Sequence, residues 1–87
     1  MTDNILHTYY DIIVRAWKLF KADAQLPPSV KQSPEADEAW RGLLDRYSTD
    51  LAEQYKGTQF QGFACDIANV MLREIETIAR RQEGVKA

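Results

Sequence analysis

The chain has 87 residues, of which 45% are hydrophobic and 28% are charged, and its net charge is −2 at pH 7. This length allows one domain, and the composition is that of an ordinary globular protein. No segment is a basic tract, so neither nucleic-acid phosphates nor an anionic membrane is an expected partner. The single cysteine, Cys65, excludes an internal disulfide and favours a reducing compartment, so we expect a cytoplasmic protein.

The first predicted helix covers residues 4–22, where apolar residues recur at helical spacing. Thr2 or Asp3 can serve as its N-cap. The apolar residues occupy about half of the helix circumference at ~100° per residue. They are Ile5, Leu6, Tyr9, Ile12, Ile13, Ala16, Trp17 and Phe20. Because a helix that lies on one neighbour needs a narrower apolar face, this helix should contact two neighbours.

A proline-containing loop is predicted for residues 23–33. Pro27 and Pro28 cannot continue a helix, because each lacks an N–H group and restricts the residue before it. Leu26 and Val30 are the apolar residues of this segment, and we expect them to hold the loop over one end of the core.

The second predicted helix covers residues 34–56 without a break. Ser33 followed by Pro34 is typical of a helix start, because the hydroxyl caps the first turn and proline fits its first position. Gly57 is predicted to end the helix with a positive φ angle.

The third predicted helix covers residues 59–82. Thr58 and Gln61 have the spacing of a capping box, in which the hydroxyl and the amide each bond a free N–H group. Gly84 is a natural stop, and residues 83–87 are expected to form a frayed tail.

The short connection at Gly57 makes the second and third helices a tight antiparallel hairpin. The hairpin pairs residues of the two helices at the same height, and in pairs such as Leu51 with Ala64 and Leu44 with Met71 both residues are apolar. We therefore predict a single all-α domain, a three-helix bundle in which the first helix packs into the groove of the hairpin.

Arg41 and Glu74 are charged residues that fall within the apolar faces of their helices. The hairpin register puts them at the same height. A structural ion pair is the favoured interpretation, and a ligand-binding carboxylate at Glu74 is the alternative.

His7 is the only histidine, and it lies one turn from both Asp3 and Asp11. A His–Asp contact can prepare a base for catalysis, but no nucleophile is placed beside it, so a solvated surface histidine is favoured. One histidine and Cys65 are too few ligands for a metal site, and no glycine-rich phosphate loop is present. We predict no catalytic residue, no metal and no cofactor.

The flanks of the first helix are the candidate partner-binding surfaces. Tyr10 and Trp17 lie on one flank, Ile12 and Leu19 lie on the other, and they cannot all reach the centre of a three-helix core. Unless the proline loop covers one flank, apolar surface remains available, which usually marks an interface. Aromatic residues are enriched at interfaces. We therefore predict self-association, as in a homodimer, or binding of a protein partner through Tyr10 and Trp17.

Residues 55–64, Tyr-Lys-Gly-Thr-Gln-Phe-Gln-Gly-Phe-Ala, together with Tyr9-Tyr10-Asp11, carry a family resemblance. They resemble small helical accessory proteins of bacterial phages and conjugative elements. The resemblance implies an accessory or partner-binding role and supplies no catalytic residues.

The predicted function is a non-enzymatic protein–protein interaction or accessory module. The first alternative is a small nucleic-acid-associated regulator, which the acidic charge balance disfavours and which a basic surface stripe would favour. The second alternative is a small enzyme, which would require a deep cleft containing His7 or Glu74.

Overall fold

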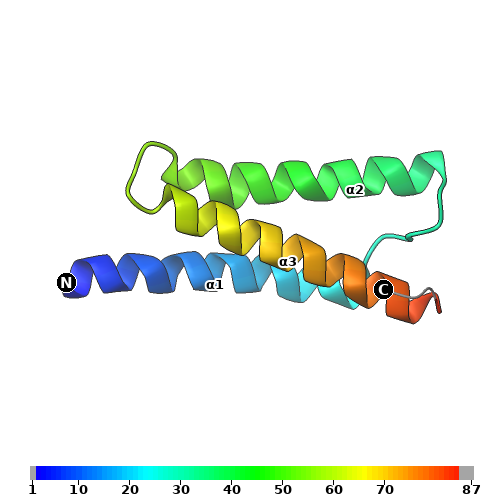
Figure 1. Cartoon of the computed structure of the whole chain (residues 1–87), viewed down its shortest axis with the longest axis horizontal. Helices are drawn as coiled ribbons and strands as arrows, with labels where there is room; N and C mark the ends of the chain where they lie inside the picture. The colour runs from blue at the N-terminus through cyan, green and yellow to red at the C-terminus, as the bar shows by residue number, and fades with distance from the viewer. Residues whose placement is uncertain (1, 85–87) are drawn as a thin grey trace.

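The computed structural model describes residues 2–84, which contain three α-helices and no strand. In chain order these are α1 (Asp3–Gln25), α2 (Pro34–Tyr47) and α3 (Gln61–Gln82) (Figure 1). The molecule is elongated, with principal extents of 46 × 20 × 18 Å. The predicted all-α, three-helix fold is confirmed.

Two of the three predicted hydroxyl caps are present, at Thr2 and Ser33, whereas α3 has no side-chain cap. The Thr2 side chain accepts a hydrogen bond from the Ile5 N–H, and the Ser33 side chain accepts one from the Ala36 N–H at 3.0 Å. The first helix ends at Gln25, three residues later than predicted. The reason is local, because a proline restricts only the residue that precedes it, and here that residue is Leu26.

The helical path after Ser33 is continuous as far as Tyr55, but it is not α-helical throughout. Beyond α2 it widens into a π-helical turn, η1 (Ser48–Ala52), and then tightens into a 3-10 turn, η2 (Glu53–Tyr55). A π turn contains one more residue per hydrogen-bonded ring than an α-helical turn. Tyr47, the last residue of α2, and Leu51 of η1 are both fully buried.

The turn between η2 and α3 uses the predicted residues in a different way. Gly57 has a φ of +78°, as predicted. The Gln61 side chain accepts a hydrogen bond from the Gly57 N–H at 2.9 Å, and the Thr58 hydroxyl accepts one from the Phe60 N–H at 3.1 Å. The side chains of Thr58 and Gln61 therefore accept hydrogen bonds from backbone N–H groups within the turn. Helix α3 begins at Gln61, two residues later than predicted.

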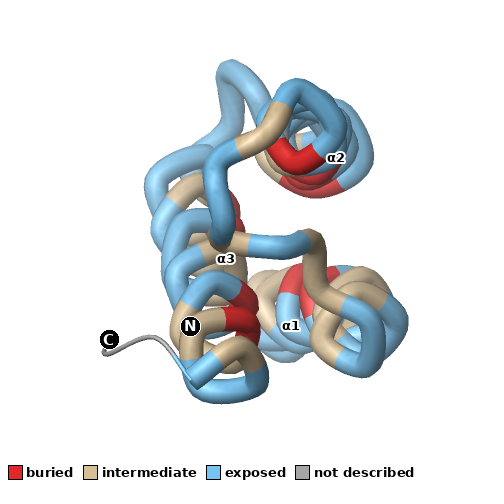
Figure 2. The backbone as a smooth tube through the Cα atoms, turned by 90° about the vertical axis from the view of Figure 1, so that its right-hand side faces the viewer, coloured by how far each residue is buried: buried red, intermediate tan, exposed pale blue. Residues whose placement is uncertain are grey.

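The core lies where α1, α3, η1 and the second half of α2 meet. Its buried residues are Ile12, Ala16, Leu43, Tyr47, Leu51, Ala64, Ala68 and Ile75. Helix α1 packs beside α3, whereas α2 stands apart from both over much of its length (Figure 2). The first helix thus packs against α3 and η1, as a bundle of this kind requires.

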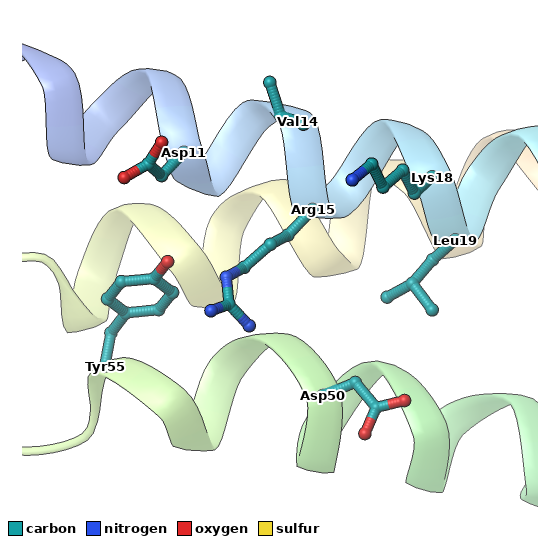
Figure 3. A pocket seen from close by; sticks show the side chains of 7 residues that line it. All are labelled: Asp11, Val14, Arg15, Lys18, Leu19, Asp50 and Tyr55. Atoms are coloured by element: carbon teal, nitrogen blue, oxygen red, sulfur yellow. The ribbon is translucent and has the colours of Figure 1, made fainter.

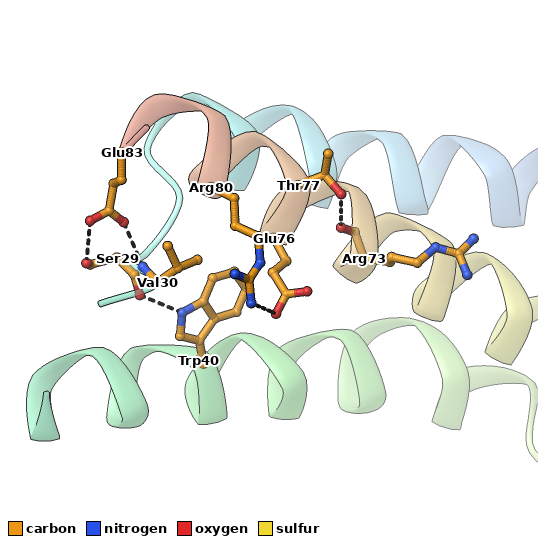
Figure 4. A network of polar contacts seen from close by, with 8 residues as sticks. All are labelled: Ser29, Val30, Trp40, Arg73, Glu76, Thr77, Arg80 and Glu83. Atoms are coloured by element: carbon orange, nitrogen blue, oxygen red, sulfur yellow. Dashed lines mark hydrogen bonds and ion pairs between the residues drawn. The ribbon is translucent and has the colours of Figure 1, made fainter. Parts of the chain in front are cut away.

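The predicted tight hairpin is correct only near its turn. Leu44, which was expected to face Met71, is 52% exposed, because α2 and α3 diverge away from the turn (Figure 1). The small side chains of Ala64 and Ala68 permit a close approach at the turn end. At the other end the Trp40 indole lies between the two helices (Figure 4).

A loop from residue 26 to residue 33 closes the open end of the hairpin (Figure 4). The Glu83 carboxylate accepts hydrogen bonds from the Ser29 hydroxyl at 2.8 Å and from the Val30 N–H at 2.7 Å. The Trp40 indole N–H donates to the Ser29 carbonyl oxygen at 2.8 Å. We call these four residues the Glu83 clasp. Its donors stabilise the carboxylate and lower the pKa of Glu83 below its ordinary value.

Two expectations about this end of the molecule are corrected. Leu26 is 89% exposed and does not hold the loop on the core, whereas Val30 is partly buried. Glu83, expected to lie in a frayed tail, is bonded to the loop instead. The remainder of that predicted tail, residues 85–87, lies outside the described residues.

Candidate functional site

Helix α1 carries an exposed apolar surface. Of the seven large apolar residues that are exposed in residues 2–84, four lie on this helix: Leu6 (52%), Tyr10 (60%), Ile13 (47%) and Trp17 (52%). Their separations of four, three and four residues place them on one line along the helix. We call these four residues the α1 stripe. Tyr10 and Trp17 are thus exposed where the sequence places a partner-binding surface.

The stripe is open because α1 packs on its other side. Ile12 and Ala16 are fully buried against the rest of the core. Tyr9 makes edge-to-face contacts with Phe60 and Phe63, with ring centroids 5.1 and 4.9 Å apart. Ile12, predicted to lie on an outer flank with Leu19, is therefore at the centre of the packed side.

Aromatic and polar contacts border the stripe. The His7 ring stacks on Tyr10 with a centroid separation of 5.9 Å, and the Trp17 ring lies 6.2 Å from that of Phe20. His7 Nε2 is 3.5 Å from a carboxylate oxygen of Asp11, and the His7 side chain is 71% exposed. This exposure fits the solvated surface histidine that the sequence favours.

The predicted ion pair between Arg41 and Glu74 does not form. Both residues are exposed, and the ion pairs in the described part of the chain involve other residues. The prediction assumed that α2 and α3 stay close along their whole length. Because they diverge, charges at the same height on the two helices do not meet.

A cleft of about 570 Å³ lies between α1 and the η1–η2 segment (Figure 3). Arg15 extends from α1 into this cleft toward Tyr55. Its lining residues are Asp11, Val14, Arg15, Lys18, Leu19, Asp50 and Tyr55. Two acidic and two basic side chains balance one another there, so the cleft does not select a ligand of either charge.

The divergence of α2 and α3 leaves a groove between them. It consists of two cavities of about 370 and 320 Å³ that share Leu44 and Leu72. Cys65 lines the first of these cavities. Neither cavity, nor the cleft beside α1, is lined by His7 or Glu74, the residues on which the enzyme alternative depends.

A polar cluster joins the C-terminal end of α1 to the end of α2. Asp23 accepts a hydrogen bond from the Arg46 guanidinium at 2.8 Å, and the Asp23 side chain is only 12% exposed. The other Asp23 carboxylate oxygen and the Tyr47 hydroxyl are buried without a hydrogen-bond partner in the described chain. Burial raises the pKa of Tyr47 above its ordinary value, and the Asp23 charge raises it further. This cluster is a structural contact.

Residues 2–84 contain no group of three or more histidine, cysteine, aspartate or glutamate side chains that could hold a metal ion. None of the described helices combines the length and apolarity that crossing a membrane requires. No protein-family model, curated protein or solved structure matches this chain.

The sequence identified half of this surface. It assigned Tyr10 and Trp17 to the binding face but counted Leu6 and Ile13 only as part of a broad apolar arc. The four-three-four spacing of all four residues was a signal that could have grouped them.

Proposed function

We propose that the chain is a non-enzymatic protein–protein interaction module that binds its partner through the α1 stripe. The observation that supports this is the exposure of Leu6, Tyr10, Ile13 and Trp17 in one continuous line. Contiguous exposed apolar residues usually mark interaction surfaces. Tyrosine and tryptophan are the residue types that most often dominate binding free energy.

An accessory role encoded on a bacterial mobile element follows from the family resemblance and is part of this proposal. The alternative, a nucleic-acid-associated regulator, has less support. Phosphate binding requires an uncompensated basic surface, but Arg15 and Lys18 share their cleft with Asp11 and Asp50.

The proposal is tested by affinity capture from the native host with three forms of the chain as bait. The first is the wild type, the second carries Tyr10→Gln and Trp17→Gln, and the third carries Arg41→Gln and Glu74→Gln. The third form is the control, because it changes two residues that are also exposed but lie outside the stripe. Circular dichroism must first show that all three are equally folded.

We expect the wild type and the control to retain the same protein, whether a different protein or an untagged copy of the chain itself. The stripe variant should lose it, because two large apolar contacts are removed. If all three baits retain the same proteins, the stripe is not the binding surface and the proposal is wrong.

A further inference from the structure

We infer that the partner of the α1 stripe is a second copy of this chain, with the two α1 helices packed antiparallel along their stripes. This inference rests on the proposed function, because it takes the stripe as the binding surface. Three features of α1 support it: the order of the side chains along the stripe, the charges at its two ends, and its area.

The spacing of the stripe is that of a two-helix seam. Separations of four, three and four residues recur in helices that pack along their length at a shallow angle. If two stripes pack antiparallel about their midpoint, Tyr10 lies opposite Ile13, and Leu6 lies opposite Trp17. Every layer then combines one large aromatic ring with one aliphatic side chain, which fills the interface evenly. A parallel arrangement would instead place Trp17 against Trp17 and Leu6 against Leu6.

The charges at the two ends of the stripe are complementary in the antiparallel arrangement. Lys21 follows Asp3 by 18 residues, which is five complete turns at about 3.6 residues per turn, so both lie on the same side of α1. Both are exposed, and neither belongs to an ion pair within residues 2–84. Antiparallel packing places Asp3 of each copy beside Lys21 of the other, on the same side of the seam, whereas parallel packing puts the equivalent flanks of the two copies on opposite sides of the seam and does not pair these charges.

The area of the stripe matches a weak but specific dimer. Each of its four residues leaves about half of its surface exposed, which for such side chains is roughly 100 Å² each, or about 800 Å² for two copies. The flanking residues bring the total near the ~1,000 Å² that a specific interface requires. A two-fold arrangement uses the same surface on both copies, so it closes at the dimer.

The core of the single chain gives a further reason for pairing. Ten apolar residues are buried in the described chain, and five of them are alanines. A domain of this size buries a limited share of its surface. Covering four large residues on α1 would therefore add substantially to the buried apolar surface.

Sedimentation equilibrium from nanomolar to high micromolar concentration tests self-association, with Leu6→Lys and Leu44→Lys as a matched pair. Both leucines are 52% exposed, but only Leu6 belongs to the stripe. We expect the wild type and Leu44→Lys to form dimers with similar dissociation constants. Leu6→Lys should weaken the dimer by about tenfold or more, because it places a charge in the seam.

A charge exchange tests the orientation. Asp3→Lys alone and Lys21→Asp alone should each weaken the dimer several-fold, and the double variant should restore wild-type affinity, since both ends regain opposite charges. If the double variant is no tighter than the single variants, the antiparallel arrangement is wrong.

The outcomes separate this inference from the proposed function. A wild-type chain that stays monomeric at every concentration, or a Leu44→Lys variant as weak as Leu6→Lys, overturns self-pairing through the stripe. If a different protein is still captured through Tyr10 and Trp17, the proposed function stands without the dimer. If stripe-dependent capture is also absent, both are wrong.

Discussion

The two sides of α1 are both apolar, but only one is covered. Ile12 is fully buried, whereas Ile13, the next residue and the same type, is 47% exposed. The sequence predicts two neighbours for α1, and α3 and η1 are those neighbours, yet both lie on the inner side. The difference teaches that helical periodicity identifies apolar surface but does not say which part of it the rest of the chain covers.

The largest expected effect is the loss of stability when Ile12, rather than Ile13, is replaced by alanine. Ile12→Ala should lower the free energy of unfolding by about 2–5 kcal/mol, because it leaves a cavity in a packed core. Ile13→Ala should lower it by less than about 1 kcal/mol in dilute solution, where the stripe is uncovered. Urea unfolding measures both. Equal losses would show that the two sides of α1 are equally covered.

The turn at Gly57 connects η2 to α3, and its positive φ angle is the next feature to test. Gly57→Ala should destabilise the fold by about 1 kcal/mol, because alanine is unfavourable at positive φ. Gly62→Ala is the control, since Gly62 lies within α3 and a Cβ there would meet no atom within 4 Å. Chemical denaturation should show a gain for Gly62→Ala of up to about 1 kcal/mol. A gain for Gly57→Ala would contradict the turn geometry.

The burial of Tyr47 on the inner side can be tested by measuring how the free energy of unfolding depends on pH. Its pKa is raised in the folded state, so the unfolded chain loses this proton first as pH rises above the ordinary value near 10. Tyr47 therefore contributes its full stabilisation below that pH and loses it above. The free energy of unfolding should fall more steeply in alkali for the wild type than for Tyr47→Phe. Identical slopes would mean that the Tyr47 hydroxyl is not buried beside the Asp23 carboxylate.

The smallest effect is expected at the Glu83 clasp, which lies away from the packed centre of α1. The pKa of Glu83 is lowered in the folded state, so its contribution is present above the ordinary value near 4.5 and is lost as pH falls through the folded-state pKa. Glu83→Gln should remove this acid-dependent part while leaving α1 unchanged. An NMR titration of the Glu83 carboxyl group tests it, and an unshifted midpoint would contradict the clasp.

The sequence was sufficient for features with local causes. The caps at Thr2 and Ser33 and the positive φ of Gly57 each depend on a few neighbouring residues. Tyr10 and Trp17 were found as exposed aromatics because the apolar arc of α1 is wider than its neighbours can cover.

The features that the sequence missed depend on distant contacts. The divergence of α2 and α3 separates Arg41 from Glu74, and it follows from the size of side chains between two helices rather than from either helix alone. Glu83 binds Ser29 across 54 residues of sequence, with no local signal. The π turn at η1 changes the hydrogen-bond pattern while the apolar spacing continues through it, so periodicity does not reveal it.

The most direct test of the central claim follows the exposure of Trp17 as the concentration of the chain changes. The chain has two tryptophans, so Trp40→Phe leaves Trp17 as the only one, and acrylamide quenching of its fluorescence then measures its exposure. We expect Trp17 to be readily quenched at nanomolar concentration, where single chains leave the stripe open, and protected at high micromolar concentration, where a second copy covers it. Protection at every dilution would show that the stripe is buried within one chain, and equal quenching at all concentrations would show that no second copy covers it.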